Sequence, residues 1–424
     1  MAFAPKVVDL DGLRVVLVKD DRQSVTVQAM VGTGSREESD EVAGVAHFLE
    51  HFVFKGTRKF PGMFDIDEAV DMVGGARNAY TSNGDIGFWV KVDKEKVDLA
   101  VKIVGQLVTE PLLPGRHFEK ERGTIIEELN LYEDMPDSKA FEEQWKLLFG
   151  KTNLGRPVIG TRESLANMKP SDLRHYLDKW FVKDNMLIGV VGNWDSESRL
   201  LDSIKIEFEG IIRGKDKSPK KYSYRHTPQK KARFGLVSRK AEQAQLSIGL
   251  TALPIGHPLR YAMYLVNIIL GGGSISRLFR EVREKRGWAY SIGSGTDSFV
   301  DAGAFLIGAG LPRDKIKEAV DLITQIMWGL PGMGKWGIKE KELAMAKECY
   351  RGRISLNFDR PERVLGYALS DLMFENKIYT PEEIKESADK VTMKEIREVC
   401  RMIFKPSHLN MVILGDYEKL PVEI

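Results

Sequence analysis

The sequence predicts an α+β protein made of two homologous halves, each a mostly antiparallel sheet packed with helices. Its 424 residues are too many for one ordinary hydrophobic core and indicate two domains of about 200 residues each. A pattern of strands and helices in the first half recurs in the second half, which an internal duplication explains better than two unrelated domains. The predicted domains are residues 1–212 and 234–424, joined by a polar, basic linker at residues 213–233.

The first half begins with strands. Residues 13–18 and 24–31 are rich in β-branched side chains, and the polar residues between them predict a turn. A helix follows, with Ser39 or Asp40 as its N-terminal cap and Gly56 as its end. The remaining elements predicted for this half are a helix near residues 64–73, strands at 78–82 and 87–92, and a long amphipathic helix at 97–109.

The second half repeats this order of elements. The corresponding segments are strands at 234–237 and 244–250, a helix at 260–270, a strand at 304–308 and a helix at 314–327. The clearest repeat closes each half: a helix and then a strand that ends in glycine, within residues 169–192 and 392–415. These echoes are the evidence for a duplicated architecture.

Composition narrows the class of protein. Hydrophobic residues at 43% and charged residues at 29% are typical of a soluble globular chain, and a formal net charge of +2 gives no electrostatic footprint for nucleic acid. Two cysteines, Cys349 and Cys400, are too few for a disulfide framework. We therefore expect both to be core residues of a protein in a reducing compartment. No apolar run reaches the roughly 18 residues of a membrane span, and residues 1–6 do not resemble a targeting segment. We therefore expect a cytoplasmic protein that binds neither nucleic acid nor membrane.

The most informative segment is the pentad at residues 47–51, His-Phe-Leu-Glu-His. On a helix, His47 and His51 are four positions apart and project from one face, and Glu50 projects beside them. Two neutral imidazoles and a carboxylate that contacts a bound water are the groups of a catalytic zinc site with an open position. The alternative is an amphipathic helix that carries two histidines by chance, but the chain has only seven histidines in all.

A catalytic zinc ion needs a third protein ligand, which we expect from a helix packed against the pentad. Residues 121–130 have the apolar spacing of such a helix and carry Glu121, Glu127 and Glu128. Glu121 and Glu128 are seven positions apart and share a face, whereas Glu127 points about 100° away. Periodicity therefore leaves either Glu121 or Glu128 as the ligand, and a solvated acidic helix as the alternative.

At this point the residues resemble a family. His-x-x-Glu-His at 47–51, followed by Glu121 and Glu128, is similar to the signature of the pitrilysin-type (inverzincin) zinc metallopeptidases. That family includes insulin-degrading enzyme, the mitochondrial processing peptidase and short bacterial relatives. The resemblance covers essentially the whole chain, including residues 54–57 and 78–81. It implies a short two-domain bacterial form, similar to the β subunit of the processing peptidase, with a LuxS/processing-peptidase-like metallopeptidase fold.

The resemblance assigns a role to each polar residue of the first half. It implies that His47, His51 and Glu128 are the ligands of one Zn²⁺ per chain. Glu50 becomes the general base that takes a proton from the zinc-bound water. Glu121 becomes a carboxylate behind the ligands that orients one of the histidines.

Substrate contacts are implied in both halves. Asn78 and Ala79 would lie on a sheet edge, to which a peptide adds as a further strand through its main chain. In the second half, the glycines at 271–273 and then Arg283 and Tyr290 resemble a family segment that donates hydrogen bonds to a substrate carbonyl and to the oxyanion. Without the resemblance, the glycines would be a helix end and Arg283 a surface charge.

The sequence thus predicts a zinc metalloendopeptidase that hydrolyses peptides or unfolded polypeptide segments inside a closed chamber. Long relatives hold four such units in one chain, so the resemblance implies that this chain pairs with another, most simply as a homodimer. One alternative is a non-catalytic structural or partner subunit of a processing-peptidase-like assembly, which typically lacks part of the metal set. Another is a maturation peptidase specific for presequences.

Overall fold

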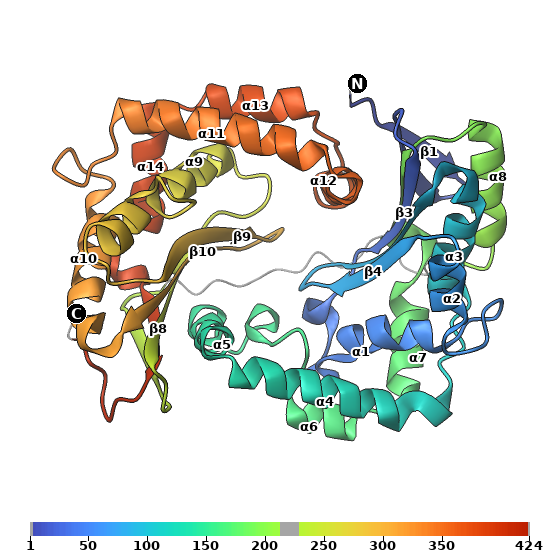
Figure 1. Ribbon diagram of the computed structural model, residues 1–424, viewed down its shortest axis with the longest axis horizontal. Coiled ribbons are helices and arrows are strands. Elements are labelled where there is room, and N and C mark those ends of the chain that lie inside the picture. Colours follow the sequence, from blue (N-terminus) through green and yellow to red (C-terminus); the bar gives the residue numbers. More distant parts are fainter. Residues whose placement is uncertain (1–2, 213–228, 423–424) are drawn as a thin grey trace. The chain divides into compact units, whose positions relative to one another are not determined.

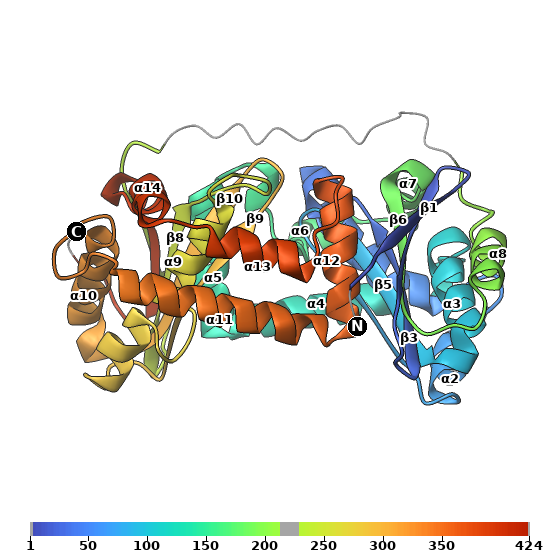
Figure 2. The ribbon, with the colours of Figure 1, turned by 90° about the horizontal axis from the view of Figure 1, so that it is seen from above.

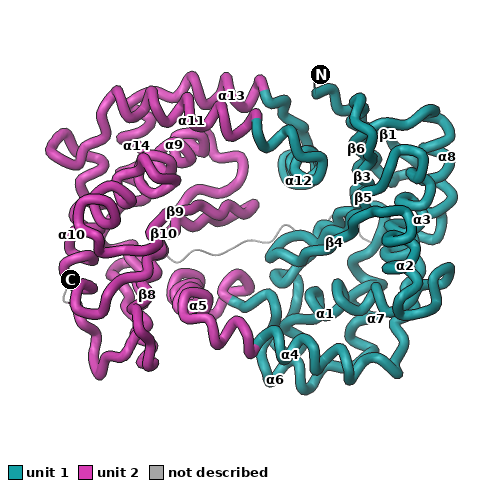
Figure 3. Tube along the Cα trace, viewed as in Figure 1, with its two compact units in different colours: residues 1–129, 156–221, 356–381 teal, residues 130–155, 222–355, 382–424 magenta. Residues whose placement is uncertain are grey.

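The computed structural model describes residues 3–212 and 229–422, so most of the predicted linker at 213–233 lies outside the described residues. The chain divides into two compact units, each assembled from three segments of the sequence (Figure 3). Unit 1 comprises residues 1–129, 156–221 and 356–381, and unit 2 comprises residues 130–155, 222–355 and 382–424.

Unit 1 is built on a six-stranded sheet with the strand order β1-β2-β6-β3-β5-β4 (Figure 1). The strands are β1 (Lys6–Leu10), β2 (Leu13–Lys19), β3 (Ser24–Val31), β4 (Ala76–Thr81), β5 (Ile86–Asp93) and β6 (Met186–Gly192). Neighbouring strands are antiparallel except for β2 and β6, which confirms the predicted mostly antiparallel sheet. Because β4 is last in this order, its outer edge pairs with no strand of the described residues.

Helices cover both faces of this sheet. On one face, α3 (Val97–Thr109) packs against β3 and β5 and against α8 (Glu197–Glu207), which lies beside it in both views (Figures 1 and 2). The other helices of unit 1 are α1 (Val45–Phe52), α2 (Asp65–Asp71), α4 (Phe118–Asp134), α6 (Arg162–Asn167), α7 (Pro170–Trp180) and α12 (Pro361–Phe374). The last residues of α4 belong to unit 2.

Unit 2 repeats the design with a five-stranded sheet in the order β7-β11-β8-β10-β9. Its strands are β7 (Arg233–Ser238), β8 (Gln243–Thr251), β9 (Ser291–Ser298), β10 (Gly303–Pro312) and β11 (Asn410–Gly415). Its helices are α5 (Pro136–Phe149), α9 (Arg260–Leu270), α10 (Ile316–Gly329), α11 (Glu340–Phe358), α13 (Pro381–Asp389) and α14 (Met393–Ile403). As in unit 1, one pair of neighbouring strands is parallel, β7 with β11, and the others are antiparallel.

The two halves of the sequence exchange one helix each. From the first half, α5 packs on β8 and β11 of unit 2, and Ala140 of this helix is buried there. From the second half, α12 packs on β6 and β3 of unit 1 and buries Leu365 and Leu369. The compact units therefore differ from the continuous halves 1–212 and 234–424, whose boundaries stay a prediction about the duplication.

Most elements lie where the sequence predicts them, but the helix of the pentad begins later. Instead of starting after Ser39 or Asp40, α1 starts at Val45, and residues 40–42 form a separate 3₁₀ turn. The cause is Gly44, whose φ of 91° lies in the left-handed region and separates the two helical segments. The predicted cap was therefore wrong. No helix in the described part of the chain is long and apolar enough to cross a membrane.

Candidate metal centre

The helix that carries the pentad is capped by a buried carboxyl group from the preceding loop. Glu38 Oε2 accepts a hydrogen bond from the Gly44 backbone N–H at 2.8 Å, and Oε1 accepts one from Ala46 at 2.9 Å. These are donors that a helix N-terminus leaves without an intrahelical partner. The side chain of Arg156 donates to the backbone oxygen of Glu38 at 2.7 Å. The start of α1 is thus tied to the loop before it.

The apolar side of α1 fixes its position against α4. Phe48, Leu49 and Phe52 are fully buried. The ring of Phe48 stacks on that of Phe118, at the first position of α4, with 4.7 Å between centroids, and Phe52 meets the same ring edge-on at 5.7 Å. Such aromatic packing determines both the distance between the helices and their rotation. The polar side of the pentad consequently faces the acidic side chains of α4.

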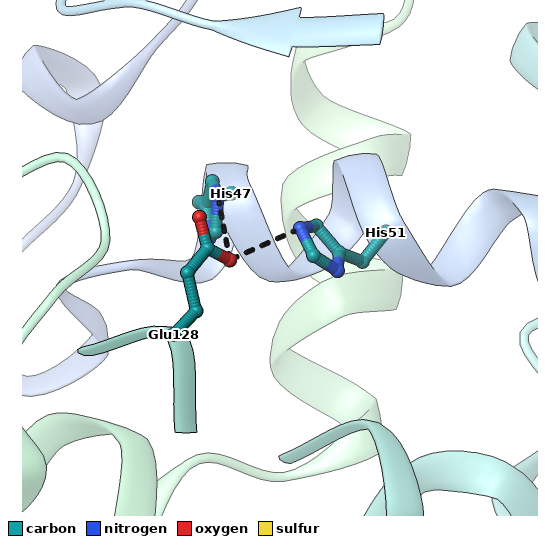
Figure 4. Close-up of side chains that lie close together, drawn as sticks. All are labelled: His47, His51 and Glu128. Atoms are coloured by element: carbon teal, nitrogen blue, oxygen red, sulfur yellow. Dashed lines mark ion pairs between the residues drawn. The ribbon is translucent and has the colours of Figure 1, made fainter. Parts of the chain in front are cut away.

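Three of the predicted residues converge on one point (Figure 4). Glu128 Oε2 lies 3.7 Å from His47 Nε2 and 3.5 Å from His51 Nε2, and one ligand atom from each residue lies within 4.8 Å of the others. A tetrahedral zinc site with metal–ligand distances of about 2.0–2.1 Å separates its ligand atoms by about 3.3–3.4 Å. Two imidazole nitrogens and a carboxylate oxygen at these separations fit a zinc ion with one position left open.

The protonation state of His47 also suits metal binding. Burial, assisted by the neighbouring His51, lowers the pKa of His47 to about 3, so the ring is neutral near pH 7. A neutral imidazole is the form that coordinates a metal. The other ring nitrogen, Nδ1, is buried and has no hydrogen-bond partner among the described residues.

His51 is held from behind by Glu121. Its Nδ1 lies 3.1 Å from Glu121 Oε1, so that Nε2 faces Glu128. The other oxygen of Glu121 lies 2.9 Å from Lys55 Nζ. Burial would lower the pKa of His51, but the hydrogen bond to Glu121 and the carboxylates around the ring outweigh it and raise that pKa. Burial would likewise raise the pKa of Glu121, but the contacts with His51 and Lys55 outweigh it and lower that pKa.

These contacts separate the glutamates that periodicity left open. Glu128 faces Nε2 of both histidines, whereas Glu121 lies at Nδ1 of His51. Glu127 is exposed on α4. The geometry therefore favours Glu128 as the ligand and Glu121 as the carboxylate that orients a histidine.

Glu50 lies between the histidines and the edge strand of the sheet. Its Oε2 accepts a hydrogen bond from Thr81 Oγ1, at the end of β4, at 2.7 Å. Burial raises the pKa of Glu50, and the Thr81 hydrogen bond partly opposes this. Asn78 and Ala79, predicted to bind substrate, lie on the same strand, and Asn78 is exposed. The Ala79 N–H donates to the Asn78 side-chain oxygen at 2.9 Å.

Arg283 and Tyr290 are brought together in unit 2. A short π-helical turn, Phe279–Glu284, carries Arg283, whose Nη1 donates to the backbone oxygen of Tyr290 at 2.6 Å. The guanidinium lies 5.6 Å from the centre of the Tyr290 ring, and this tyrosine is 79% exposed. The glycines at 271–273 follow α9, and Gly271 is its C-terminal cap. A substrate role for these residues stays a prediction.

Three polar residues of this centre had no role in the sequence-based prediction: Glu38, Lys55 and Thr81. Lys55 and Thr81 belong to short motifs that resemble the family, but their partners are fixed only by tertiary packing. Glu38 acts on a helix that begins seven residues later, which no capping pattern covers.

Two family models match consecutive parts of the chain. "Insulinase (Peptidase family M16)" matches residues 14–162, which contain the candidate metal centre, and "Peptidase M16 inactive domain" matches residues 167–348. The second segment contains the helix α9, which has no histidine pair. Together the two models cover well over half of the 424 residues.

Curated relatives span nearly the whole chain. An uncharacterized zinc protease of Bacillus subtilis, YmxG, is 31% identical over 399 residues, covering 93% of this chain and 94% of its own length. An uncharacterized zinc protease of Mycobacterium tuberculosis, Rv2782c, is 33% identical over 421 residues, covering 98% and 94%.

Solved structures share the fold. A protease from Helicobacter pylori superposes with a TM-score of 0.89 at 22% identity, covering 98% of this chain and all of the other. A peptidase M16 inactive domain from Pseudomonas fluorescens gives a TM-score of 0.88 at 18% identity, with 99% and 100% coverage. At these identities the likeness extends to the architecture alone, and it agrees with the predicted α+β fold.

Proposed function

Because the chain belongs to the insulinase family of peptidases, family M16, we propose that it is a zinc-dependent endopeptidase that hydrolyses peptides and unfolded polypeptide segments. The observation that carries this proposal is the convergence of His47, His51 and Glu128 on one point, with Glu50 beside them. A zinc ion bound there would supply a Lewis acid for the scissile carbonyl and lower the pKa of an attacking water.

In this mechanism Glu50 moves the protons. Its carboxylate takes the proton of the attacking water and passes it to the leaving amine. Thr81 donates to one oxygen of Glu50 at 2.7 Å and limits its rotation, which leaves the other oxygen for the water. Removing the carboxylate while keeping the shape of the side chain should therefore slow hydrolysis strongly without loss of the metal.

The edge strand β4 is the proposed substrate platform. An extended peptide that pairs with its outer edge would run past Glu50, because Thr81 at the end of this strand already contacts that side chain. Recognition through the main chain accepts many sequences, which suits a peptidase of broad specificity. Asn78 and Ala79 are the proposed contact residues.

We further propose that Arg283 and Tyr290 bind the substrate carbonyl and the developing oxyanion. The guanidinium and the exposed phenol lie side by side in unit 2, and both are hydrogen-bond donors. The proposed assembly is a homodimer that encloses a chamber, so that these donors serve either their own metal centre or that of the partner subunit.

The test is hydrolysis of a random peptide library, with the products identified by mass spectrometry. The wild type should cleave, and Glu50→Gln should be slower by about 10²–10⁴-fold. Glu127→Gln, an exposed glutamate on α4, is the matched control and should behave as the wild type. Equal activity of wild type and Glu50→Gln would overturn the mechanism.

A second candidate is a non-catalytic partner subunit. It draws on the description of an inactive domain in one matching family model and in one solved structure. That family model covers residues 167–348, however, whereas the candidate ligands all lie in residues 47–128. Zinc content separates the two: about one zinc per chain after metal repletion favours the peptidase, and none favours the partner subunit.

A further inference from the structure

We propose that Lys55 is a positioning residue of the metal centre, which acts on zinc affinity through Glu121 and His51. The proposal rests on the proposed zinc site and extends it by one residue. Lys55, Glu121 and His51 form a continuous chain of contacts: 2.9 Å from Nζ to one carboxylate oxygen, and 3.1 Å from the other oxygen to His51 Nδ1.

The geometry distributes the two oxygens of Glu121 between two partners. Oε2 accepts from the ammonium group and Oε1 from the imidazole, so rotation of the carboxylate would break both contacts. Lys55 ends the short 3₁₀ turn that continues α1, four residues after His51. The same stretch of backbone therefore carries both the metal-facing ring and the cation that holds its partner.

Burial decides that this ion pair matters. Pairs between exposed side chains contribute little to stability, because water and salt screen them. The side chain of Glu121 is only 6% exposed, and that of Lys55 is 24% exposed. Removing one partner from such a pair leaves a buried charge uncompensated, which is far costlier than losing a surface contact. Without Lys55, one oxygen of the Glu121 carboxylate would lose its partner, and the side chain would turn toward water.

This rotation weakens the contact that holds His51. A carboxylate that accepts from the far N–H of a metal-binding imidazole fixes the ring orientation and raises its basicity. Loss of the cation therefore reaches the zinc site even though Nζ contacts neither His47 nor Glu128 among the hydrogen bonds and ion pairs of the described residues. This separates Lys55 from residues that touch the metal or the substrate.

The experiment is a zinc titration of metal-free protein in competition with a fluorescent chelator. Lys55→Met keeps the length of the side chain and removes its charge, and it should weaken zinc binding roughly threefold to tenfold. This is less than the ~10–100-fold loss that is typical when a direct partner of a metal ligand is changed, as Glu121 is the direct partner of His51. Lys55→Arg keeps the charge and should retain most of the wild-type zinc affinity. Lys120→Met removes an exposed lysine of α4 and should leave zinc affinity unchanged.

A double-mutant cycle tests whether the effect passes through Glu121. Glu121→Gln should weaken zinc binding by itself, and adding Lys55→Met should weaken it little further. Wild-type affinity in Lys55→Met, or independent additive losses in the double mutant, would overturn the inference. A wild type that binds no zinc at all would instead contradict the proposed function. Circular dichroism and thermal unfolding of each variant exclude a loss of fold as the cause.

Discussion

Glu38 should make the folded protein less stable as the pH rises. Its carboxyl group is buried against the start of α1, and burial raises its pKa from the ordinary value of 4.5 to about 8, despite the two backbone N–H groups that donate to it. The folded state thus holds this proton more tightly than the unfolded state. The free-energy cost of ionising Glu38 in the folded state is absent below about pH 4.5, grows between the two pKa values and is complete above about pH 8.

The size of the effect follows from the two pKa values. At 1.36 kcal/mol per pKa unit, a rise from 4.5 to about 8 corresponds to roughly 5 kcal/mol in full, of which about 4 kcal/mol falls between pH 5 and pH 9. Other groups also titrate in this range, so the informative quantity is a comparison with Glu38→Gln. The amide has no charge at any pH and removes this one contribution.

The assay is urea unfolding of metal-free protein at pH 5 and at pH 9, with a chelator present so that metal binding does not vary. Wild type should lose stability relative to Glu38→Gln by up to about 4 kcal/mol over this range. Glu68→Gln removes an exposed carboxyl of α2 and should follow the wild type. A constant difference between Glu38→Gln and wild type would refute the reasoning. A wild type that gains on the variant would show that the donors of Gly44 and Ala46 keep the carboxylate ionised.

Three further predictions concern the metal centre and the substrate. Chelation should abolish hydrolysis, and added zinc should restore it. His47→Ala or Glu128→Ala should lower the zinc bound per chain well below one, as measured by elemental analysis. If a variant keeps its full zinc content, the residue changed in it is not a ligand. If each active site combines residues of two subunits, mixing Glu50→Gln subunits with Tyr290→Phe subunits should restore part of the peptidase activity. Activity no higher than that of either variant alone would count against a shared site. Peptides N-methylated at alternating amides should be cleaved poorly if they pair with β4, and normal cleavage would argue against strand addition.

The histidine pair of α1 could be predicted because its sequence signal is local. The spacing of His47 and His51 places both rings on one face of any helix, whatever the rest of the chain does. The choice between Glu121 and Glu128 could not be made in this way, since residues seven apart share a face. The choice depends on how α4 is positioned along α1, and the stacking of Phe48 on Phe118 fixes that position.

The supporting residues escaped prediction because their partners are distant or unconventional. Lys55 meets Glu121 from 66 positions away in the sequence, and only tertiary packing brings them together. Glu38 replaces the cap predicted at Ser39 or Asp40, because the left-handed Gly44 separates the 3₁₀ turn from the helix. A glycine directly before the helix was the one local signal of that break.

The exchange of α5 and α12 gives a physical reason why a chain whose described residues hold one candidate metal centre contains two halves. Leu365 and Leu369 of α12 are fully buried on the sheet of unit 1, and each contributes about 1.5–3 kcal/mol of transfer free energy there. Without the second half, this face of the sheet that supports the pentad would lie open to water. The second half therefore stabilises the metal-binding unit directly, independently of any contribution that Arg283 and Tyr290 make to catalysis. This structural requirement does not involve α9, which has no histidine pair, because it is α12 that packs on the sheet of unit 1.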